Sequence, residues 1–265
     1  MAESEILIPL HEALRRNARQ HPERDAYIWY GQHISWRQVD EASDAVAAHL
    51  QQLGVKPGEP VALFMNNCPQ YIVAHYAVQK IGAIVCPCGP LNKEHELEYQ
   101  LNDLQARVII AADVLLPVVD KVRGSTALQH VLAVRYGDWL PAAPTLPLPV
   151  ELQAPVQPLP SNVTSFWDLM HSGARPAPVD VDMDEVALMT YTSGTTGLPE
   201  GAMLSFGAAA YKTAGASQVT GVSAEDVLLA VAPLYHIAGM SMGVNMPVDS
   251  GAPCVLLHRF DPLAV

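Results

Sequence analysis

The chain has 265 residues, 50% of them hydrophobic, and carries 27 Asp and Glu against 15 Lys and Arg, a formal net charge of -12. An apolar fraction of this size can furnish a substantial buried core, which indicates a globular protein. The acidic balance, with no basic run interleaved with aromatic residues, argues against nucleic acid as a partner.

The first residues, MAESEILIPL, have no positively charged region followed by an apolar core, and no apolar stretch approaches the ~20 residues of a membrane helix. We therefore expect a cytoplasmic protein without a transmembrane segment. Four cysteines, at 68, 86, 88 and 254, are too scattered for a disulfide framework. A single residue between Cys86 and Cys88 does not suit one tetrahedral metal ion, so we expect buried thiols.

The first half of the chain alternates helical patterns with short apolar runs. Helices are predicted over 9–20, 35–54, 69–82 and 93–106, strands over 60–66, 83–87 and 107–112, and a hairpin over 25–36 that turns at Gly31 and Gln32. A capping box, Ser35 to Gln38, opens the second helix, and Gly54 closes it. Continuous apolar strands separated by helices predict βαβ units, and therefore an α/β fold whose sheet is covered on both faces.

The stretch from 140 to 161 holds seven prolines and no periodicity. We expect a surface connection inside one partial domain, 1–265, because the alternation resumes at 165–170. Further predictions are strands over 186–191, 226–233 and 253–257, a short apolar run over 201–205 and a helix over 206–217. Asp261 and Pro262 are typical of a helix start, so the sequence is expected to stop within a larger fold.

The segment YTSGTTGLPEG, residues 191–201, has four hydroxyl side chains and two glycines between Thr192 and Gly197. Glycines allow backbone N–H groups to turn toward one point, which is how a phosphate cradle is built. The spacing of a Walker A loop is absent. Taken alone, such a cluster is more often a solvated turn.

The full string resembles the phosphate-binding signature of the adenylate-forming (AMP-binding) superfamily, Y-T-S-G-T-T-G-x-P-K-G, at ten of eleven positions. PLYHIAG, residues 233–239, is similar to the second core motif of that family. GVKPGEPVALF and the following GAIVCPCGP, within 54–90, are similar to its early strand-helix-strand segment. Together these stretches resemble the N-terminal portion of an acyl-CoA synthetase of the long-chain fatty acid–CoA ligase type.

The resemblance implies the layered sheets and helices of that family's N-terminal domain and a two-step reaction. A fatty or aryl carboxylic acid reacts with ATP and Mg2+ to give an acyl-adenylate, and coenzyme A then takes the acyl group. Implied nucleotide-binding residues are Tyr191, Thr192, Ser193, Gly194, Thr195, Thr196, Gly197, Leu198, Pro199, Glu200 and Gly201, with Thr192 also the magnesium-associated residue. Implied substrate-binding residues are Tyr235, His236, Gly239 and Met240, although an isolated HIAGMSM would more often be a core histidine with packing methionines.

Glu200 departs from the family, which has Lys at this position. Opposite charges ~4 Å apart gain roughly 4 kcal/mol at an effective dielectric of about 20, and reversing one sign turns the gain into repulsion. Even ~3 kcal/mol is about a hundredfold in affinity or rate. Glu200 is therefore expected to weaken ATP binding, unless its side chain faces water and the charge matters little.

The later family motifs, including the catalytic Lys of a C-terminal domain, would lie beyond residue 265, so no complete catalytic set is expected here. We expect this chain alone to show no acyl-CoA synthesis. The alternative is a non-catalytic pseudoenzyme or binding module of the same fold. A peptide-synthetase adenylation domain is disfavoured because no acidic residue lies between Gly239 and Pro247. Apolar surface left exposed at the edge of an incomplete fold could also favour a homo-oligomer.

Overall fold

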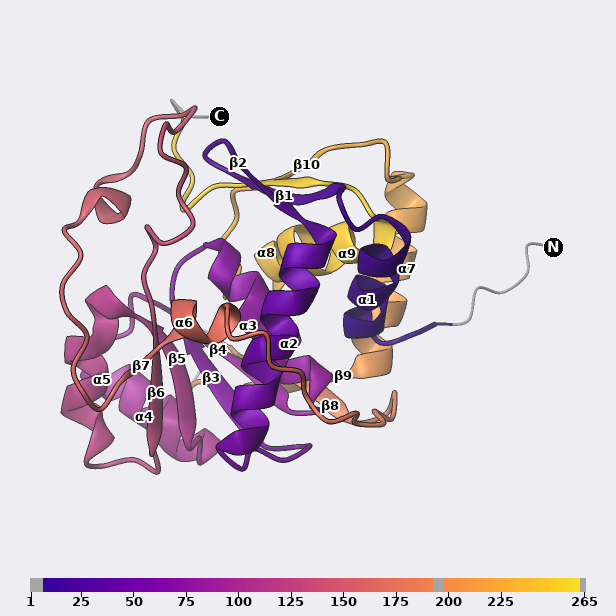
Figure 1. Ribbon diagram of the computed structural model, residues 1–265. Helices are drawn as coiled ribbons and strands as arrows, with labels where there is room; N and C mark the ends of the chain where they lie inside the picture. The colour runs from indigo at the N-terminus through magenta and orange to yellow at the C-terminus, as the bar shows by residue number, and fades with distance from the viewer. Residues whose placement is uncertain (1–6, 193–197, 263–265) are drawn as a thin grey trace.

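A computed structural model describes residues 7–192 and 198–262. Its strands form two sheets, a seven-stranded one with the order β7-β6-β5-β3-β4-β8-β9 and a four-stranded one with the order β10-β11-β1-β2, which lies across the top of the molecule in Figure 1. The large sheet contains β3 (Pro60–Phe64), β4 (Ile84–Cys88), β5 (Val108–Ala112), β6 (His130–Val134), β7 (Thr164–Ser165), β8 (Val186–Tyr191) and β9 (Gly201–Ser205). The small sheet contains β1 (Asp25–Trp29), β2 (Gln32–Ser35), β10 (Leu228–Ala230) and β11 (Cys254–Leu256).

Helices separate most of these strands along the chain. The α-helices are α1 (Leu10–Gln20), α2 (Trp36–Gln52), α3 (Pro69–Lys80), α4 (Glu94–Leu104), α5 (Leu116–Arg123), α6 (Phe166–Met170), α7 (Phe206–Thr220), α8 (Ile237–Met240) and α9 (Met246–Ser250). Short 3-10 turns are η1 (Asp113–Leu115) and η2 (Val150–Gln153), and a π-helical segment, η3 (Ser241–Asn245), joins α8 to α9. The capping box at the start of α2 is present, as the sequence predicts.

The centre of the large sheet is parallel, which confirms the predicted βαβ units. β3 pairs in parallel with β4 and β5, β5 with β6, and β4 with β8, while β9 closes one edge antiparallel to β8. Both faces of these strands are covered: Val61 and Leu63 belong to the core shared with α1, α2 and α3, whereas Ala62 and Phe64 belong to the core under α4 and α5. Burial on both faces is why these strands read as unbroken apolar runs.

A buried ion cluster fixes α3 against α2. The side chain of Lys80 is 0% exposed, and its Nζ lies 2.6 Å from Asp40 Oδ1 and 2.7 Å from Asp44 Oδ1. Arg15 of α1 reaches the same Asp44 oxygen at 3.3 Å. A charge this deeply buried is tolerated only because partners satisfy it, so the cluster specifies how three helices meet.

Several predicted boundaries differ from the structure. The β1–β2 hairpin turns at Tyr30 and Gly31, both with positive φ, one residue earlier than predicted. The strand predicted over 226–233 is reduced to the three residues of β10, the helix after β9 runs on to Thr220, and residues 237–250 are continuously helical. Asp261 and Pro262 are described, but the residues after them, where the predicted helix would continue, lie outside the described range.

The proline-rich segment, 140–161, has no strand among its residues and one short turn, η2. Thr145 N donates to Tyr30 O at 3.0 Å, and a Cβ on Gly31 would lie 2.5 Å from Thr145 Cγ2. The hairpin turn therefore needs glycine both for its φ and for this close approach.

All four cysteines are free and buried, as expected from the sequence. Among the described residues, no helix combines the length and apolar character needed to cross a membrane.

His75 of α3 gives a pH-dependent stability that can be measured. Burial lowers its pKa from 6.5 to about 3, and neither ring nitrogen has a hydrogen-bond partner within the described structure. The unfolded chain takes up a proton below pH 6.5 that the folded chain does not take up until about pH 3, so stability falls as the pH falls through this window. Between pH 7 and pH 5 the share of the loss due to His75 should be roughly 2 kcal/mol, and His75→Met should remove this share while leaving that of His11, whose pKa burial also lowers to about 3.

Urea unfolding at the two pH values measures this difference. The same substitution at the exposed His21 is the control and should leave the difference as it is in the unmodified chain. An equal pH dependence with and without the His75 ring would contradict the assignment.

Candidate functional site

The loop that carries the first motif, residues 191–201, has an outgoing stem at Tyr191 and Thr192 and a returning stem at 198–201. The two stems are joined at their base. Tyr191 ends β8 and pairs with Gly201, which begins β9. Thr192 N donates to Glu200 O at 2.9 Å, and Glu200 N donates to Thr192 Oγ1 at 3.1 Å. The loop therefore leaves the sheet and returns to it through one hydrogen-bonded pair. Ser193, Gly194, Thr195, Thr196 and Gly197 lie outside the described residues.

Helix α4 contacts both stems. Tyr99 Oη donates to Pro199 O at 2.9 Å on the returning stem, and Tyr191 Oη donates to Asp103 Oδ2 at 2.6 Å on the outgoing stem. Burial raises the pKa of Tyr191 well above its usual value, and the hydrogen bond to Asp103 and the charge of that carboxylate raise it further. The phenol therefore stays protonated and serves as a hydrogen-bond donor.

The segment that carries the second motif is held by a buried amide. Asn67, three residues after β3, donates from Nδ2 to Ala232 O at 3.0 Å and to Leu257 O at 3.1 Å, and its Oδ1 accepts from Leu234 N at 2.8 Å. The ring of His258 contacts the backbone of the same residue, with Nδ1 2.9 Å from Asn67 O. Ala232 and Leu234 lead directly into Tyr235, so one side chain fixes where the motif stands.

The motif itself combines a tight backbone approach with an exposed imidazole. A Cβ on Gly239 would lie 2.0 Å from Pro233 O, so only glycine fits there. His236 is exposed and caps α8, because its Nδ1 accepts from Ala238 N at 3.4 Å. A neutral ring then carries its proton on Nε2, which is left as a donor. The core-histidine interpretation is therefore wrong for His236, whereas Met240 is fully buried in the core.

One cavity of about 700 Å³ brings the two motifs together. Its wall comes from three parts of the chain: the end of β4 with α4, the loop stems with β8 and β9, and the start of α8. Of the implied site residues, Tyr191, Thr192, Leu198, Pro199, Tyr235 and His236 line it, while Glu200, Gly201, Gly239 and Met240 are not among its lining residues. The sequence did not single out the contribution of α4 and the segment just before it, which is Asn92, His95, Glu96, Tyr99 and Gln100.

The charges around this cavity are few. Among the described lining residues, Glu96 carries a carboxylate, His95 and His236 carry imidazoles, and there is no Lys or Arg. Lys93 N donates to Glu96 Oε2 at 3.0 Å, so this carboxylate is engaged at the start of α4. Glu200 lies on the returning stem with its side chain exposed. The described part of the cavity wall therefore offers hydroxyl, amide and imidazole groups to a ligand and no fixed positive charge.

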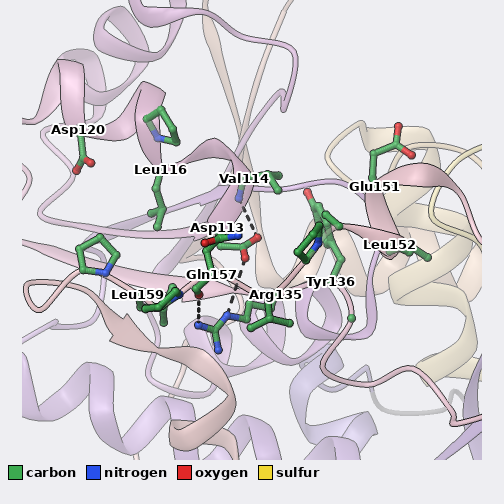
Figure 2. Close-up of a pocket in the computed structure, with 17 residues that line it drawn as sticks. Asp113, Val114, Leu116, Asp120, Arg135, Tyr136, Glu151, Leu152, Gln157 and Leu159 are labelled. Atoms are coloured by element: carbon green, nitrogen blue, oxygen red, sulfur yellow. Dashed lines mark hydrogen bonds and ion pairs between the residues drawn. The ribbon is translucent and has the colours of Figure 1, made fainter.

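A second cavity, of about 290 Å³, lies where the proline-rich segment passes over the ends of β5 and β6 (Figure 2). Arg135 Nη2 donates to Gln157 O at 2.6 Å, and its Nε lies 3.9 Å from Asp113 Oδ2. Partial burial raises the pKa of Asp113 against the hydrogen bond from Val114 N and the charge of Arg135. None of the described residues of either motif lines this cavity, and its polar groups hold the proline-rich segment to the sheet.

The layered α/β fold, with a ligand-sized cavity beside a glycine-rich loop between two strands, is the fold class of the AMP-binding enzymes. The chain belongs to the AMP-binding enzyme family, which matches residues 14–265. Long-chain-fatty-acid–CoA ligases are among its curated relatives: the one from Bacillus subtilis is 30% identical over 96% of this chain, and one from Escherichia coli is 31% identical over 94%. A 4-coumarate–CoA ligase of Humulus lupulus is 29% identical over 96%.

The chain spans about half the length of the curated relatives it matches: 47% of the Bacillus protein, 46% of the Escherichia protein and 44% of the Humulus protein. Solved structures share the fold over nearly all of this chain. A long-chain-fatty-acid–CoA ligase from Archaeoglobus fulgidus superimposes with a TM-score of 0.80 at 25% identity, covering 96% of this chain and 48% of that one. The anthranilate CoA ligase AuaEII, in complex with anthranoyl-AMP, gives 0.82 at 24%, covering 97% and 46%.

Removing the Asn67 amide tests how the second motif is held. Asn67→Ala leaves Leu234 N and two carbonyl oxygens without partners and should destabilise the protein by on the order of 3 kcal/mol. Hydrogen exchange at the Leu234 amide should accelerate more than this global loss explains, because its own bond is gone.

The matched control is Asn17→Ala. Asn17 is also a buried amide, and it donates to Val248 O at 2.7 Å between α1 and α9, away from the cavity. Its loss should weaken α9 without selectively exposing Leu234. If both variants gave the same exchange pattern, the local role of Asn67 would be refuted.

Proposed function

We propose that the chain is the N-terminal part of an ATP-dependent acyl-CoA ligase that activates a fatty carboxylic acid, with aryl acids as the next class. The observation that carries this proposal is that both loop stems and the Tyr235–His236 pair line one cavity of about 700 Å³. Cavities of ~300–1,000 Å³ are typical of small-molecule sites. The long-chain-fatty-acid–CoA ligases reported above are 30% and 31% identical to this chain, and the 4-coumarate–CoA ligase is 29% identical. These relatives support placing fatty acids ahead of aryl acids.

The proposed reaction has two steps. In the first, a carboxylate oxygen attacks the α-phosphorus of ATP, the bond to the β-phosphate oxygen breaks, and pyrophosphate leaves. In the second, the thiol of coenzyme A loses its proton and attacks the acyl carbon, and AMP leaves. This chain would bind the phosphates through residues 191–201 and part of the acid beside Tyr235 and His236, while Gly239 and Met240 would support this segment from behind the cavity wall. No complete catalytic set is proposed within it.

The residues present suit these substrates in two respects. Thr192 Oγ1 accepts one hydrogen bond and has a second lone pair, so it can offer one oxygen to Mg2+, which usually takes its other ligands from phosphates and water. When bound, Mg2+ would neutralise phosphate charge. His236 Nε2 can donate a hydrogen bond to the acid, since Nδ1 is used by Ala238 N.

Two further properties, the location and the oligomeric state, are part of the proposal. Four free, buried thiols suit a reducing compartment and support a cytoplasmic location. Exposed apolar side chains on β9, on α7 and beside β10, including Met203, Tyr211, Val219 and Val227, support a homo-oligomer.

Pyrophosphate exchange into ATP tests the first step. We expect acid-dependent exchange, strongest with medium or long fatty acids, from a form of the protein extended to the length of its relatives, and none from the present chain. A series of fatty and aryl acids run on both forms gives the substrate class directly. If the extended form exchanged pyrophosphate with no acid of the series, the ligase proposal would fail.

A second candidate, a non-catalytic binding module, is favoured by one observation: no Lys or Arg is found among the described residues that line the cavity, and Glu200 stands where the family has Lys. In the extended form, Glu200→Lys should increase the rate of adenylate formation by up to about a hundredfold. The matched control is Glu185→Lys, the same charge change at an exposed position before the far end of β8. A variant that adenylates no faster than the parent would show that the charge at 200 is immaterial.

A further inference from the structure

We propose that helix α4 positions the loop stems for polyphosphate binding, with Tyr99 and Asp103 as positioning residues. The inference rests on the proposed function, because it gives these stems a role toward ATP. Neither residue belongs to a motif singled out in the sequence. They stand four residues apart, so they lie on one face of α4.

The two contacts of α4 act on opposite sides of the same loop. Asp103 holds the phenol of Tyr191 at the last residue of β8, and Tyr99 holds the carbonyl of Pro199 on the way back to β9. Between the stems themselves, the described hydrogen bonds are those of Thr192 with Glu200. That pair fixes the stems relative to each other, while α4 fixes them relative to the cavity, whose wall the same helix forms with His95, Glu96 and Gln100.

The helix is anchored firmly enough for this task. Leu97 and Leu101 are 0% exposed and pack in the core beneath the large sheet. The start of the helix is closed by the hydrogen bond from Lys93 N to Glu96 Oε2. A group held on a packed helix defines positions more narrowly than one held on another loop.

The chemistry of the two contacts of α4 suits the task of positioning the loop stems. Proline has no N–H, so Pro199 can join the stem's hydrogen bonding only through its carbonyl, and Tyr99 is the donor to that carbonyl. The Tyr191–Asp103 bond is assisted by the carboxylate charge, which makes it the stronger of the two. A loosened stem would present its N–H groups less accurately to a phosphate, which lowers affinity for ATP without touching the acid site.

Tyr99→Phe tests the inference by removing one oxygen atom. Hydrogen exchange at the Thr192 and Glu200 amides should accelerate roughly tenfold, while the amides at the other end of the β8–β9 pair keep their rates. In the extended form, KM for ATP should rise roughly five- to tenfold with KM for the acid unchanged. Tyr211→Phe, an exposed tyrosine on α7, is the matched control and should change neither quantity.

Asp103→Asn provides a graded second variant, because it keeps an oxygen acceptor for Tyr191 and removes the charge. It should give a smaller effect than Asp103→Ala on both readouts. Unchanged exchange at Thr192 and Glu200 in Tyr99→Phe would overturn the inference, and so would equal rises in KM for ATP and for the acid. If the extended parent bound no MgATP by calorimetry, the proposed function would fall, and the exchange rates alone would still decide whether α4 holds the stems.

Discussion

The hydrogen bonds of the Asn67 amide are the constraint on which the arrangement of this molecule most depends. The side chain lies just beyond the carboxyl end of β3 in the large sheet and reaches the backbone after β10 and after β11 in the small one. A fully satisfied buried amide has few equivalent alternatives, so it specifies a single relation between the parts that it joins. Here it sets the relation between the two sheets, and with it the place of Tyr235 and His236.

The cavity is consequently assembled from three segments, each of which is held by its own set of contacts. The segment around β4 and α4 is held by the apolar core on both faces of the large sheet. The loop stems are held by the Thr192–Glu200 pair and by α4. The start of α8 is held through Asn67. Because each anchor is a packed or hydrogen-bonded element, the polar groups on the wall can keep fixed separations, which is what a site for two reacting substrates needs.

The sequence predicts the parts of this arrangement that depend on local patterns. Unbroken apolar runs predict β3, β4 and β5, and the Ser35–Gln38 pair predicts the start of α2, because these signals are short-range. The helical path of 237–250 is missed, since its small and polar residues carry no clear period and Gly239 is required by a close approach to Pro233 that no local pattern announces. Asn67, Tyr99 and Asp103 are missed for another reason: their partners lie 88 to 190 residues away, and no local pattern encodes such pairs.

Glu200 departs from the family sequence in its side chain, whereas the fold at this position depends on its backbone. Its backbone N–H and carbonyl both pair with Thr192, so position 200 closes the loop whatever side chain it carries. The side chain is exposed and forms none of the described ion pairs. Replacing a cation by an anion here therefore alters the electrostatics of the stem and leaves its geometry intact. With Glu96 already facing the cavity and no fixed cation among its described lining residues, positive charge for a polyphosphate has to come from a bound metal ion or from outside this wall.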